Sequence, residues 1–206
     1  GDVTEIGAVI RDLEHISRWA AVSPDMEQLR GIEGHGAARY FSVFGQLLRP
    51  PWRFEGRNRR PPRDPVNALL SFGYTLLLVH ATTAAALAGL DPCVGFLHPE
   101  HRGRPSVALD LMEAFRPVVV DRLLLALINQ GMFAPEDFTA EEDGGVRMAL
   151  DARRRYVVAF EQRMITRSTT PEGQGGTYLW HLRQAARRMA HALVEETPYL
   201  PFTASV

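Results

Sequence analysis

The stretch Leu109-Asp110-Leu111-Met112-Glu113-Ala114-Phe115-Arg116-Pro117 places two acids three residues apart in an otherwise apolar run. On an α-helix this spacing puts both carboxylates on one face, where like charges repel unless a cation or a base joins them. The run from Pro105 to Asn129 is rich enough in Leu, Val and Ala to be buried, and a buried acid is costly without a partner. The sequence therefore predicts a helix that is kinked at Pro117 and whose acids meet a cation.

The rest of the chain predicts a mainly α-helical protein. Apolar residues recur at helical spacing on both sides of the opening stretch, and proline and glycine mark most of the helix ends. A short strand or the lead-in to a helix is expected over Val146–Leu150, and a flexible loop over Thr170–Gly176. The further predicted helices are Thr4–Ala21, 24–48 (capped by Ser23, with Pro24 at its first position), 64–89, 151–163 and 177–196.

Composition limits the classes of protein. A length of 206 residues fits one domain, and 46% apolar with 23% charged residues is ordinary for a globular chain. The net charge of -1 argues against a uniformly basic coat for nucleic acid, although it leaves room for a local basic patch. The single cysteine, Cys93, excludes an internal disulfide and a cysteine-rich metal site and fits a reducing compartment.

One segment has the length of a membrane span. No residue from Ala68 to Leu90 is charged, but Ser71, His80 and Thr82 interrupt the apolar run. We therefore interpret this segment as a core helix, and no membrane association is expected. The start of the chain also lacks the basic and apolar regions of a secretory signal.

Glu33 lies on the apolar stripe of the second predicted helix, among Gly31, Gly34 and Gly36. Each glycine costs a helix about 1 kcal/mol relative to alanine, and such glycines usually let another group approach the backbone closely. A tightly packed or fraying helix in which Glu33 pairs with an arginine is the alternative.

A proline-rich loop carries Arg57, Arg59, Arg60 and Arg63 and follows two aromatic residues in the segment 52–54. Guanidinium groups bind phosphates and aromatic rings stack on bases, so this loop is a candidate DNA-binding segment. A solvated connection between two helices is the alternative interpretation.

The candidate chemistry rests on Glu33, His98 and Glu113, with Asp110 beside the last. Two carboxylates and one imidazole suit Mg²⁺ or Mn²⁺ better than a structural zinc site. Such a metal ion binds a phosphate oxygen and stabilises the leaving oxygen, which is the chemistry that cuts or exchanges phosphodiesters. His98 and His101 could also suggest zinc, but no further ligands follow at zinc-like spacing. Sequence spacing alone leaves open whether the three residues meet.

Several strings in this chain resemble the CRISPR-associated integrase family, CRISPR-associated protein one, and they follow the family's order over nearly the whole chain. The strings are Gly31-Ile32-Glu33-Gly34, Arg57-Asn58-Arg59-Arg60-Pro61-Pro62-Arg63-Asp64-Pro65-Val66-Asn67, Gly95-Phe96-Leu97-His98, Arg104-Pro105-Ser106, the opening stretch, Asp121-Arg122 and Tyr199-Leu200-Pro201-Phe202.

The resemblance implies that Glu33, His98 and Glu113 bind the metal and that Asp110 supports the site. It implies a metal-dependent DNA endonuclease and integrase of CRISPR spacer acquisition, in which a prespacer 3′-hydroxyl attacks a phosphodiester of the CRISPR repeat. The implied partners are DNA, CRISPR-associated protein two and a second copy of the full-length protein. The implied location is the cytoplasm of a prokaryote.

In one respect the sequence departs from that family. Family members begin with a small β-rich domain that mediates dimerisation, and nothing in residues 1–206 corresponds to it. We therefore expect these residues to be the helical C-terminal catalytic domain of a longer protein. In some systems the integrase is fused behind the nuclease CRISPR-associated protein four, which makes such a fusion a further expectation.

Two other functions fit parts of the sequence. A catalytically silent DNA-binding scaffold would keep the arginines without the chemistry, and the presence of all three ligand types argues against it. The sequence argues more strongly against an unrelated all-α metal phosphohydrolase, because the chain lacks the adjacent His-Asp pair that one large group of such enzymes uses.

Overall fold

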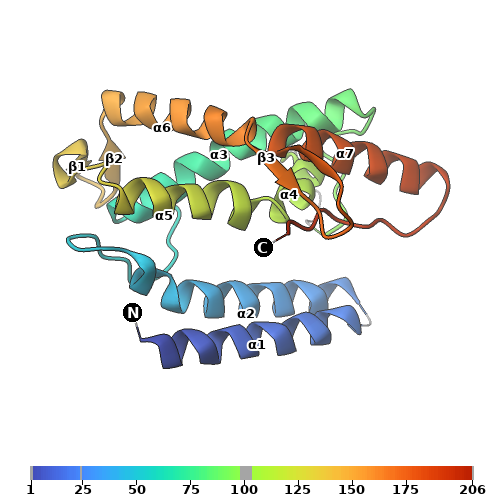
Figure 1. The fold of residues 1–206 in the computed structure, drawn as a ribbon, viewed down its shortest axis with the longest axis horizontal. Coiled ribbons are helices and arrows are strands. Elements are labelled where there is room, and N and C mark those ends of the chain that lie inside the picture. Colours follow the sequence, from blue (N-terminus) through green and yellow to red (C-terminus); the bar gives the residue numbers. More distant parts are fainter. Residues whose placement is uncertain (1, 24, 98–103, 206) are drawn as a thin grey trace. The chain divides into compact units, whose positions relative to one another are not determined.

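The structure, a computed structural model, describes residues 2–23, 25–97 and 104–205, and this part of the chain is mainly α-helical, as predicted (Figure 1). The chain divides into two compact units. The first contains residues 1–69 and 127–148, and the second contains residues 70–126 and 149–206.

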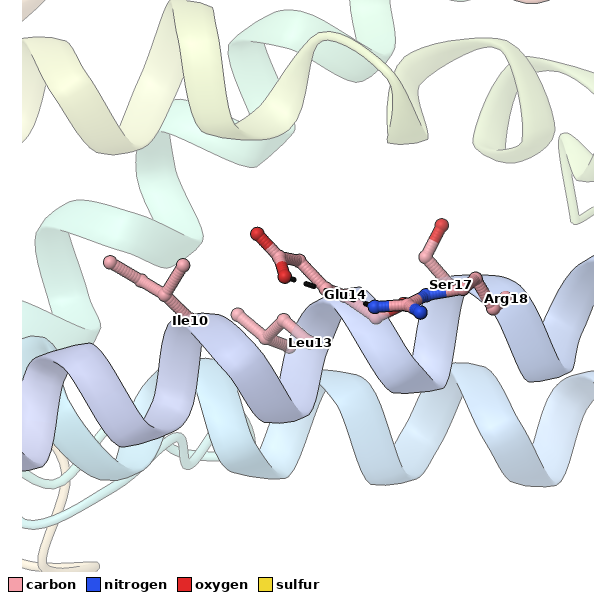
Figure 2. A pocket seen from close by; sticks show the side chains of 5 residues that line it. All are labelled: Ile10, Leu13, Glu14, Ser17 and Arg18. Atoms are coloured by element: carbon pink, nitrogen blue, oxygen red, sulfur yellow. Dashed lines mark hydrogen bonds and ion pairs between the residues drawn. The ribbon is translucent and has the colours of Figure 1, made fainter.

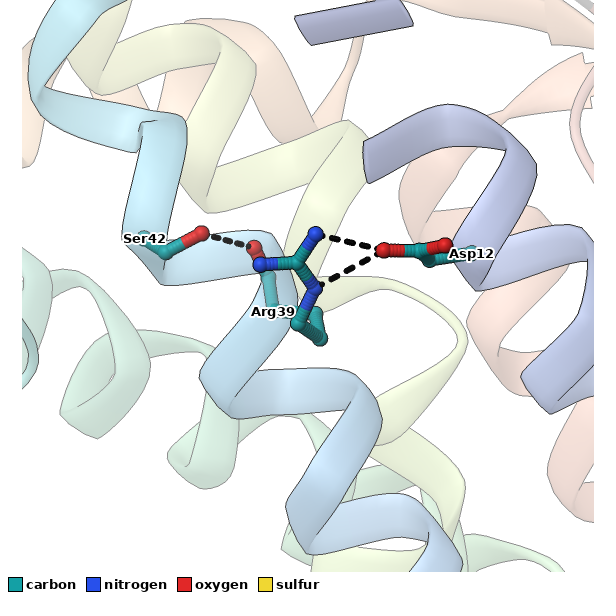
Figure 3. A network of polar contacts seen from close by, with 3 residues as sticks. All are labelled: Asp12, Arg39 and Ser42. Atoms are coloured by element: carbon teal, nitrogen blue, oxygen red, sulfur yellow. Dashed lines mark hydrogen bonds and ion pairs between the residues drawn. The ribbon is translucent and has the colours of Figure 1, made fainter. Parts of the chain in front are cut away.

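A helical hairpin forms most of the first unit. Helices α1 (Val3–Ala21) and α2 (Met26–Phe44) lie side by side and are joined by a short turn (Figure 1). An ion pair joins them, since Arg39 donates from Nε to Asp12 Oδ2 over 3.1 Å and also from Nη2 (Figure 3). Because both side chains are partly exposed, this pair contributes little stability compared with burial of Val9 and Ile32.

The turn between these helices corrects one prediction. Asp25, and not Ser23, caps α2, because its carboxylate accepts a hydrogen bond from the Gln28 N–H over 2.8 Å. The Ser23 hydroxyl instead donates to the Asp25 carbonyl at 3.1 Å. Pro24, the predicted first helical residue, lies outside the described residues.

The first unit also contains a small antiparallel sheet. For Val146–Leu150 the sequence allowed either a short strand or the lead-in to a helix, and the structure has a strand there, β2 (Val146–Met148). It pairs with β1 (Phe138–Ala140), and Phe138 lies opposite Met148. Strand β1 was not predicted, because three residues are too few to show a period of two. Two 3₁₀ turns complete this unit, η1 (Gly45–Leu47) and η3 (Pro135–Asp137).

The second unit is a helical assembly with one β-hairpin. The predicted loop 170–176 is wrong in part, because the chain there forms the tip and one strand of this hairpin, in which Arg167 faces Thr177. Gly173, with φ +83°, supplies the left-handed turn at the tip. Most of α3 (Pro65–Leu87) and α5 (Arg122–Asn129) belongs to this unit, while residues 65–69 and 127–129 belong to the first. The other elements are α4 (Ser106–Glu113), the π-helix η2 (Arg116–Asp121), α6 (Leu150–Met164), β3 (Arg167–Thr169), β4 (Gly175–Thr177) and α7 (Tyr178–Val194).

Helix α3 is the predicted uncharged helix. Among the described helices it alone is long and apolar enough to cross a membrane, judged by length and composition, and 44% of its most apolar window is buried. Leu70, Leu77 and Ala81 are fully buried, and Tyr74 donates its hydroxyl proton to buried Asp121 over 2.7 Å. These contacts agree with the expectation of a core helix.

The helix predicted to open near Pro105 and to kink at Pro117 is interrupted as expected, and the chain continues as separate helical segments. Helix α4 ends at Glu113, and a π-helix starts at Arg116. The interruption falls where predicted, since Pro117 has no N–H to donate and its ring hinders a regular α-turn. Arg163 of α6 stabilises the widened turn by donating from Nε to the Val118 carbonyl over 3.1 Å.

Gly73 of α3 permits close packing in the second unit. A Cβ atom there would lie 2.3 Å from the Tyr156 hydroxyl oxygen and 2.6 Å from a Val120 methyl carbon. Burial, together with the negative charge of Asp121, raises the pKa of Tyr156 far above its usual range, so this tyrosine stays protonated.

We predict opposite effects of alanine at the glycines of α2 and α3. A Cβ at Gly31 or Gly34 would meet no atom within 4 Å, so Gly31→Ala and Gly34→Ala should each increase the free energy of unfolding by about 1 kcal/mol. Gly73→Ala should decrease it by roughly 1–3 kcal/mol through overpacking. Urea denaturation measures all three, and a loss of stability in Gly31→Ala would contradict the open space at that position.

Candidate functional site

The two acids of the opening stretch lie on α4, where the i, i+3 spacing places them on one face as predicted. Both are partly buried, and both line one pocket of about 370 Å³. The pocket lies within the second unit. The other residues around it are Phe96, Leu97, Met189, Ala192, Leu193, Thr197 and Tyr199.

Asp110 fixes the segment that leads to His98. Its Oδ2 accepts hydrogen bonds from the backbone N–H groups of Phe96, at 2.6 Å, and of Leu97, at 3.1 Å. A carboxylate that accepts two backbone hydrogen bonds is well stabilised in its charged form and holds those two residues in place. His98, the next residue, lies outside the described residues.

The same segment is held at a second point. The N–H of Val107, in the first turn of α4, donates to the Pro92 carbonyl over 3.1 Å. The loop 91–97 is therefore attached to α4 at its N-terminal turn and again at Asp110, one turn before Glu113. This arrangement distinguishes the two acids: both line the pocket, but Asp110 also holds this loop through two hydrogen bonds.

The pocket combines carboxylates with an apolar wall. Helix α7 contributes Met189, Ala192 and Leu193, and the C-terminal segment contributes Tyr199. Burial raises the pKa of the Tyr199 hydroxyl above its usual value, although the charge of Arg188 acts in the opposite direction. At neutral pH this hydroxyl is therefore a hydrogen-bond donor beside two acids.

The structure brings only part of the predicted metal site together. Glu33 is exposed on α2, in the first unit, and Glu113 belongs to the second. Among the described residues no three His, Cys, Asp or Glu side chains gather as metal ligands. The convergence of Glu33, His98 and Glu113 remains a prediction. The Glu113 carboxylate, partly buried on a pocket wall, is a hard oxygen donor of the kind that Mg²⁺ and Mn²⁺ prefer.

The predicted DNA-binding arginines have different environments. Arg59, Arg60 and Arg63 are exposed, as a phosphate-binding role requires. Arg57 is partly buried and donates from Nη1 to the Asn67 side chain over 2.7 Å and to the Asn58 carbonyl. Arg57 therefore holds the loop in its conformation.

Asn67, in the first turn of α3, organises this loop and was not singled out from the sequence. It is fully buried, accepts from the Asn58 N–H at 3.0 Å, and donates to the Gly56 carbonyl at 2.8 Å and to Asp64 Oδ2 at 2.6 Å. Asp64 caps the first turn of α3, because its Oδ1 accepts a hydrogen bond from the Asn67 N–H over 2.8 Å. An asparagine three residues after an aspartate at a helix start was therefore the signal that the sequence offered. A pocket of about 470 Å³ borders the loop, lined by Arg53, Glu55, Gly56, Arg57, Asn58, Arg63 and Asp64.

A third pocket lies along one helix and carries no comparable chemistry. Ile10, Leu13 and Ser17 line it on α1, beside the exposed ion pair of Glu14 with Arg18 at 3.9 Å (Figure 2). An exposed pair of this kind contributes little, and the lining is otherwise mostly apolar. We assign no function to this surface.

The helical arrangement defines the class of protein. It resembles a chain in a Cas6-RT-Cas1--Cas2 complex, with a TM-score of 0.86 and 28% sequence identity, over 98% of this chain and 22% of that one. It also resembles a casposase bound to an integration product, with a TM-score of 0.80 and 28% identity, over 88% of this chain and 51% of that one. The fold is thus shared with a protein of a Cas6-RT-Cas1--Cas2 complex and with a casposase.

The sequence identifies the family. Residues 1–162 match the family described as CRISPR associated protein Cas1, and the chain belongs to this family. A CRISPR-associated endonuclease Cas1 of Rhodospirillum rubrum is 50% identical over 73% of this chain and 45% of its own length. One from Thermus thermophilus is 43% identical over 96% of this chain and 61% of its own length.

A third relative joins two activities in its name. It is a CRISPR-associated exonuclease Cas4/endonuclease Cas1 fusion of Geobacter sulfurreducens, 41% identical over 94% of this chain and 36% of its own length. The chain spans about half the length of the separate Cas1 relatives that it matches.

We predict that Asp110→Ala in the full-length protein weakens metal binding while leaving the fold intact. Loss of the two hydrogen bonds frees the segment before His98, and loss of such a supporting group typically costs 10–100-fold in metal affinity. Titration with Mn²⁺ measures the effect. Asp91→Ala is the matched control, since Asp91 Oδ1 accepts from the nearby Cys93 N–H, at 2.9 Å, a contact within one turn of the loop. Equal Mn²⁺ affinities of the two variants would contradict the role of Asp110.

Proposed function

We propose that this chain is the catalytic part of a metal-dependent DNA endonuclease and integrase that inserts prespacer DNA into a CRISPR array. The observation that carries the proposal is the arrangement of α4, in which Asp110 anchors the segment before His98 and Glu113 borders the adjoining pocket. Family membership supports it, as do the relatives whose names describe Cas1 endonucleases.

The proposed reaction is a transesterification. The oxygen of a prespacer 3′-hydroxyl forms a new bond to a phosphorus atom of the repeat, and the bond from that phosphorus to the 3′-oxygen of the cut strand breaks. The attacking hydroxyl loses a proton and the leaving oxygen gains one, so one phosphodiester replaces another and no oxidant or reductant is needed. Attack by water on the same phosphorus is the endonuclease reaction.

Glu113, Glu33 and His98 would hold the divalent ion, Mg²⁺ or Mn²⁺. When bound, such an ion lowers the pKa of a coordinated hydroxyl and stabilises negative charge on phosphate oxygens. Asp110 would keep the His98 segment in place, and the protonated Tyr199 hydroxyl is available to donate to a phosphate or sugar oxygen at the pocket.

The basic loop would bind the DNA backbone. Arg59, Arg60 and Arg63 are exposed, and the buried Asn67 network holds the loop that carries them in one conformation. A preorganised loop loses less conformational entropy when it meets phosphates than a disordered one does.

The proposed partners follow from relatives and family. They are prespacer and repeat DNA, Cas2, a second copy of the full-length protein, and Cas4 in systems where the two are fused. A Cas1 with Cas2 occurs in one similar structure, and a Cas4 fusion among the relatives. A catalytically silent DNA-binding scaffold remains the alternative, and the cytoplasm of a prokaryote remains the expected location.

We predict that Glu113→Gln in the full-length protein with its Cas2 abolishes strand transfer and cleavage but retains DNA binding. The substitution keeps the shape of the side chain and removes the charged oxygen donor that a divalent ion needs. Gel assays of integration and binding in Mn²⁺ measure both properties. Glu195→Gln, an exposed acid at the end of α7, is the control and should retain activity. Unchanged integration in Glu113→Gln would refute the role of Glu113 as a metal ligand. Absence of integration and cleavage in the wild type would favour the scaffold function.

We predict a division of roles in the basic loop. Replacing Arg59, Arg60 and Arg63 by alanine should weaken DNA binding and reduce the slope of log affinity against log salt by about 0.7–0.9 for each phosphate that the variant no longer neutralises. Arg57→Ala should chiefly lower thermal stability, because it removes the hydrogen bond to buried Asn67. An unchanged salt slope in the triple variant would show that the loop is only a solvated connection.

A further inference from the structure

The C-terminal segment after α7 borders the pocket that contains Glu113. Helix α7 ends at Val194, and residues 197–205 form neither helix nor strand. Thr197 and Tyr199 nevertheless line the pocket together with Asp110 and Glu113. Because residues 197–205 form no regular backbone hydrogen bonds, other contacts must hold this segment beside the pocket.

The main attachment of this segment is an aromatic stack. Phe202 is buried, and its ring lies parallel to that of Phe115 with the centroids 4.5 Å apart and an angle of 8° between the planes. Phe202 also contacts the buried His181 ring of α7, with the ring centroids 4.9 Å apart. Leu200, two residues earlier, is 74% exposed and makes no comparable anchor.

A backbone contact supports the same placement. The Ser205 N–H donates to the Thr169 carbonyl of β3 over 2.9 Å. At the other end of the segment the Thr197 N–H donates to the Ala192 carbonyl over 2.9 Å. Between these two points Phe202 is the one residue of the described tail whose side chain is buried.

Phe115 connects this anchor to the candidate metal ligand. It lies two residues after Glu113, at the place where α4 ends and before the π-helix begins. Regular i to i−4 hydrogen bonding does not continue through this point, so the last turn of α4 depends on side-chain packing for its orientation. The fully buried Phe115 supplies that packing, and the ring of Phe202 covers one of its faces.

We propose that Phe202 is a positioning residue for the metal site. By stacking on Phe115 it sets the end of α4 that carries Glu113, and by anchoring the tail it keeps Thr197 and Tyr199 against the pocket. The inference rests on the proposed function, because it assigns to Phe202 an effect on metal binding by Glu113. Its alternative is that Phe202 contributes only to the stability of the core.

The test compares Mn²⁺ binding by full-length variants, measured as free Mn²⁺ by electron paramagnetic resonance without any reaction. Phe202→Ala should raise the Mn²⁺ concentration for half-saturation about tenfold, as expected for loss of a group that orients a ligand. Phe202→Leu, which keeps an apolar anchor, should restore most of this loss, and Leu200→Ala should match the wild type. In integration assays Phe202→Ala should lower kcat, leave KM for DNA unchanged and recover with excess Mn²⁺.

A second aromatic variant separates positioning from stability. Phe138→Ala removes a partly buried ring of the first unit that packs against Trp52 at 5.7 Å, so it should lower the melting temperature without altering Mn²⁺ binding. If Phe202→Ala lowers the melting temperature and leaves Mn²⁺ binding unchanged, the positioning role is refuted while the proposed function stands. If the wild-type protein binds no Mn²⁺, both are refuted.

Discussion

The carboxylate of Asp110 connects the two parts of the candidate site in the second unit. By accepting hydrogen bonds from the N–H groups of Phe96 and Leu97, it ties the irregular chain before His98 to the helix that carries Glu113. The pocket beside α4 depends on this connection, because Phe96 and Leu97 form part of its wall. One side chain therefore brings together a loop and a helix that ordinary apolar packing would position less specifically.

The basic loop of the first unit is also held by one polar side chain on a helix, in this case Asn67. Asn67 is buried, and its amide bonds to Asn58, Gly56 and Asp64, so a proline- and arginine-rich segment has one conformation. In each case a short polar side chain at a helix accepts hydrogen bonds from backbone N–H groups of an irregular segment and so fixes its conformation. The residues that we propose for chemistry and for DNA binding are neighbours of these two anchors, Glu113 in one unit and the exposed arginines in the other.

The break after Glu113 changes how that residue is held in place. A continuous α-helix through residues 105–129 would fix Glu113 by its own hydrogen bonds, but Pro117 prevents this and the chain widens into a π-turn. Where these regular hydrogen bonds are missing, packing around Phe115 holds the chain, and Phe202 of the C-terminal segment supplies part of that packing. Phe202 thus packs close to a carboxylate that lies far earlier in the sequence.

The sequence by itself determined the helical class, most helix positions, the family and the candidate residues, because helical periodicity, proline and glycine signals and short motifs are local. It also distinguished Glu113 from Asp110, through the family pattern. Only the tertiary structure decided that Asp110 bonds to Phe96 and Leu97, that Arg57 faces inward while its neighbours face solvent, and that Phe202 stacks on Phe115. These contacts join residues far apart in the sequence, so helical periodicity cannot predict them. They form because the folded chain buries apolar rings and pairs hydrogen-bond donors with acceptors.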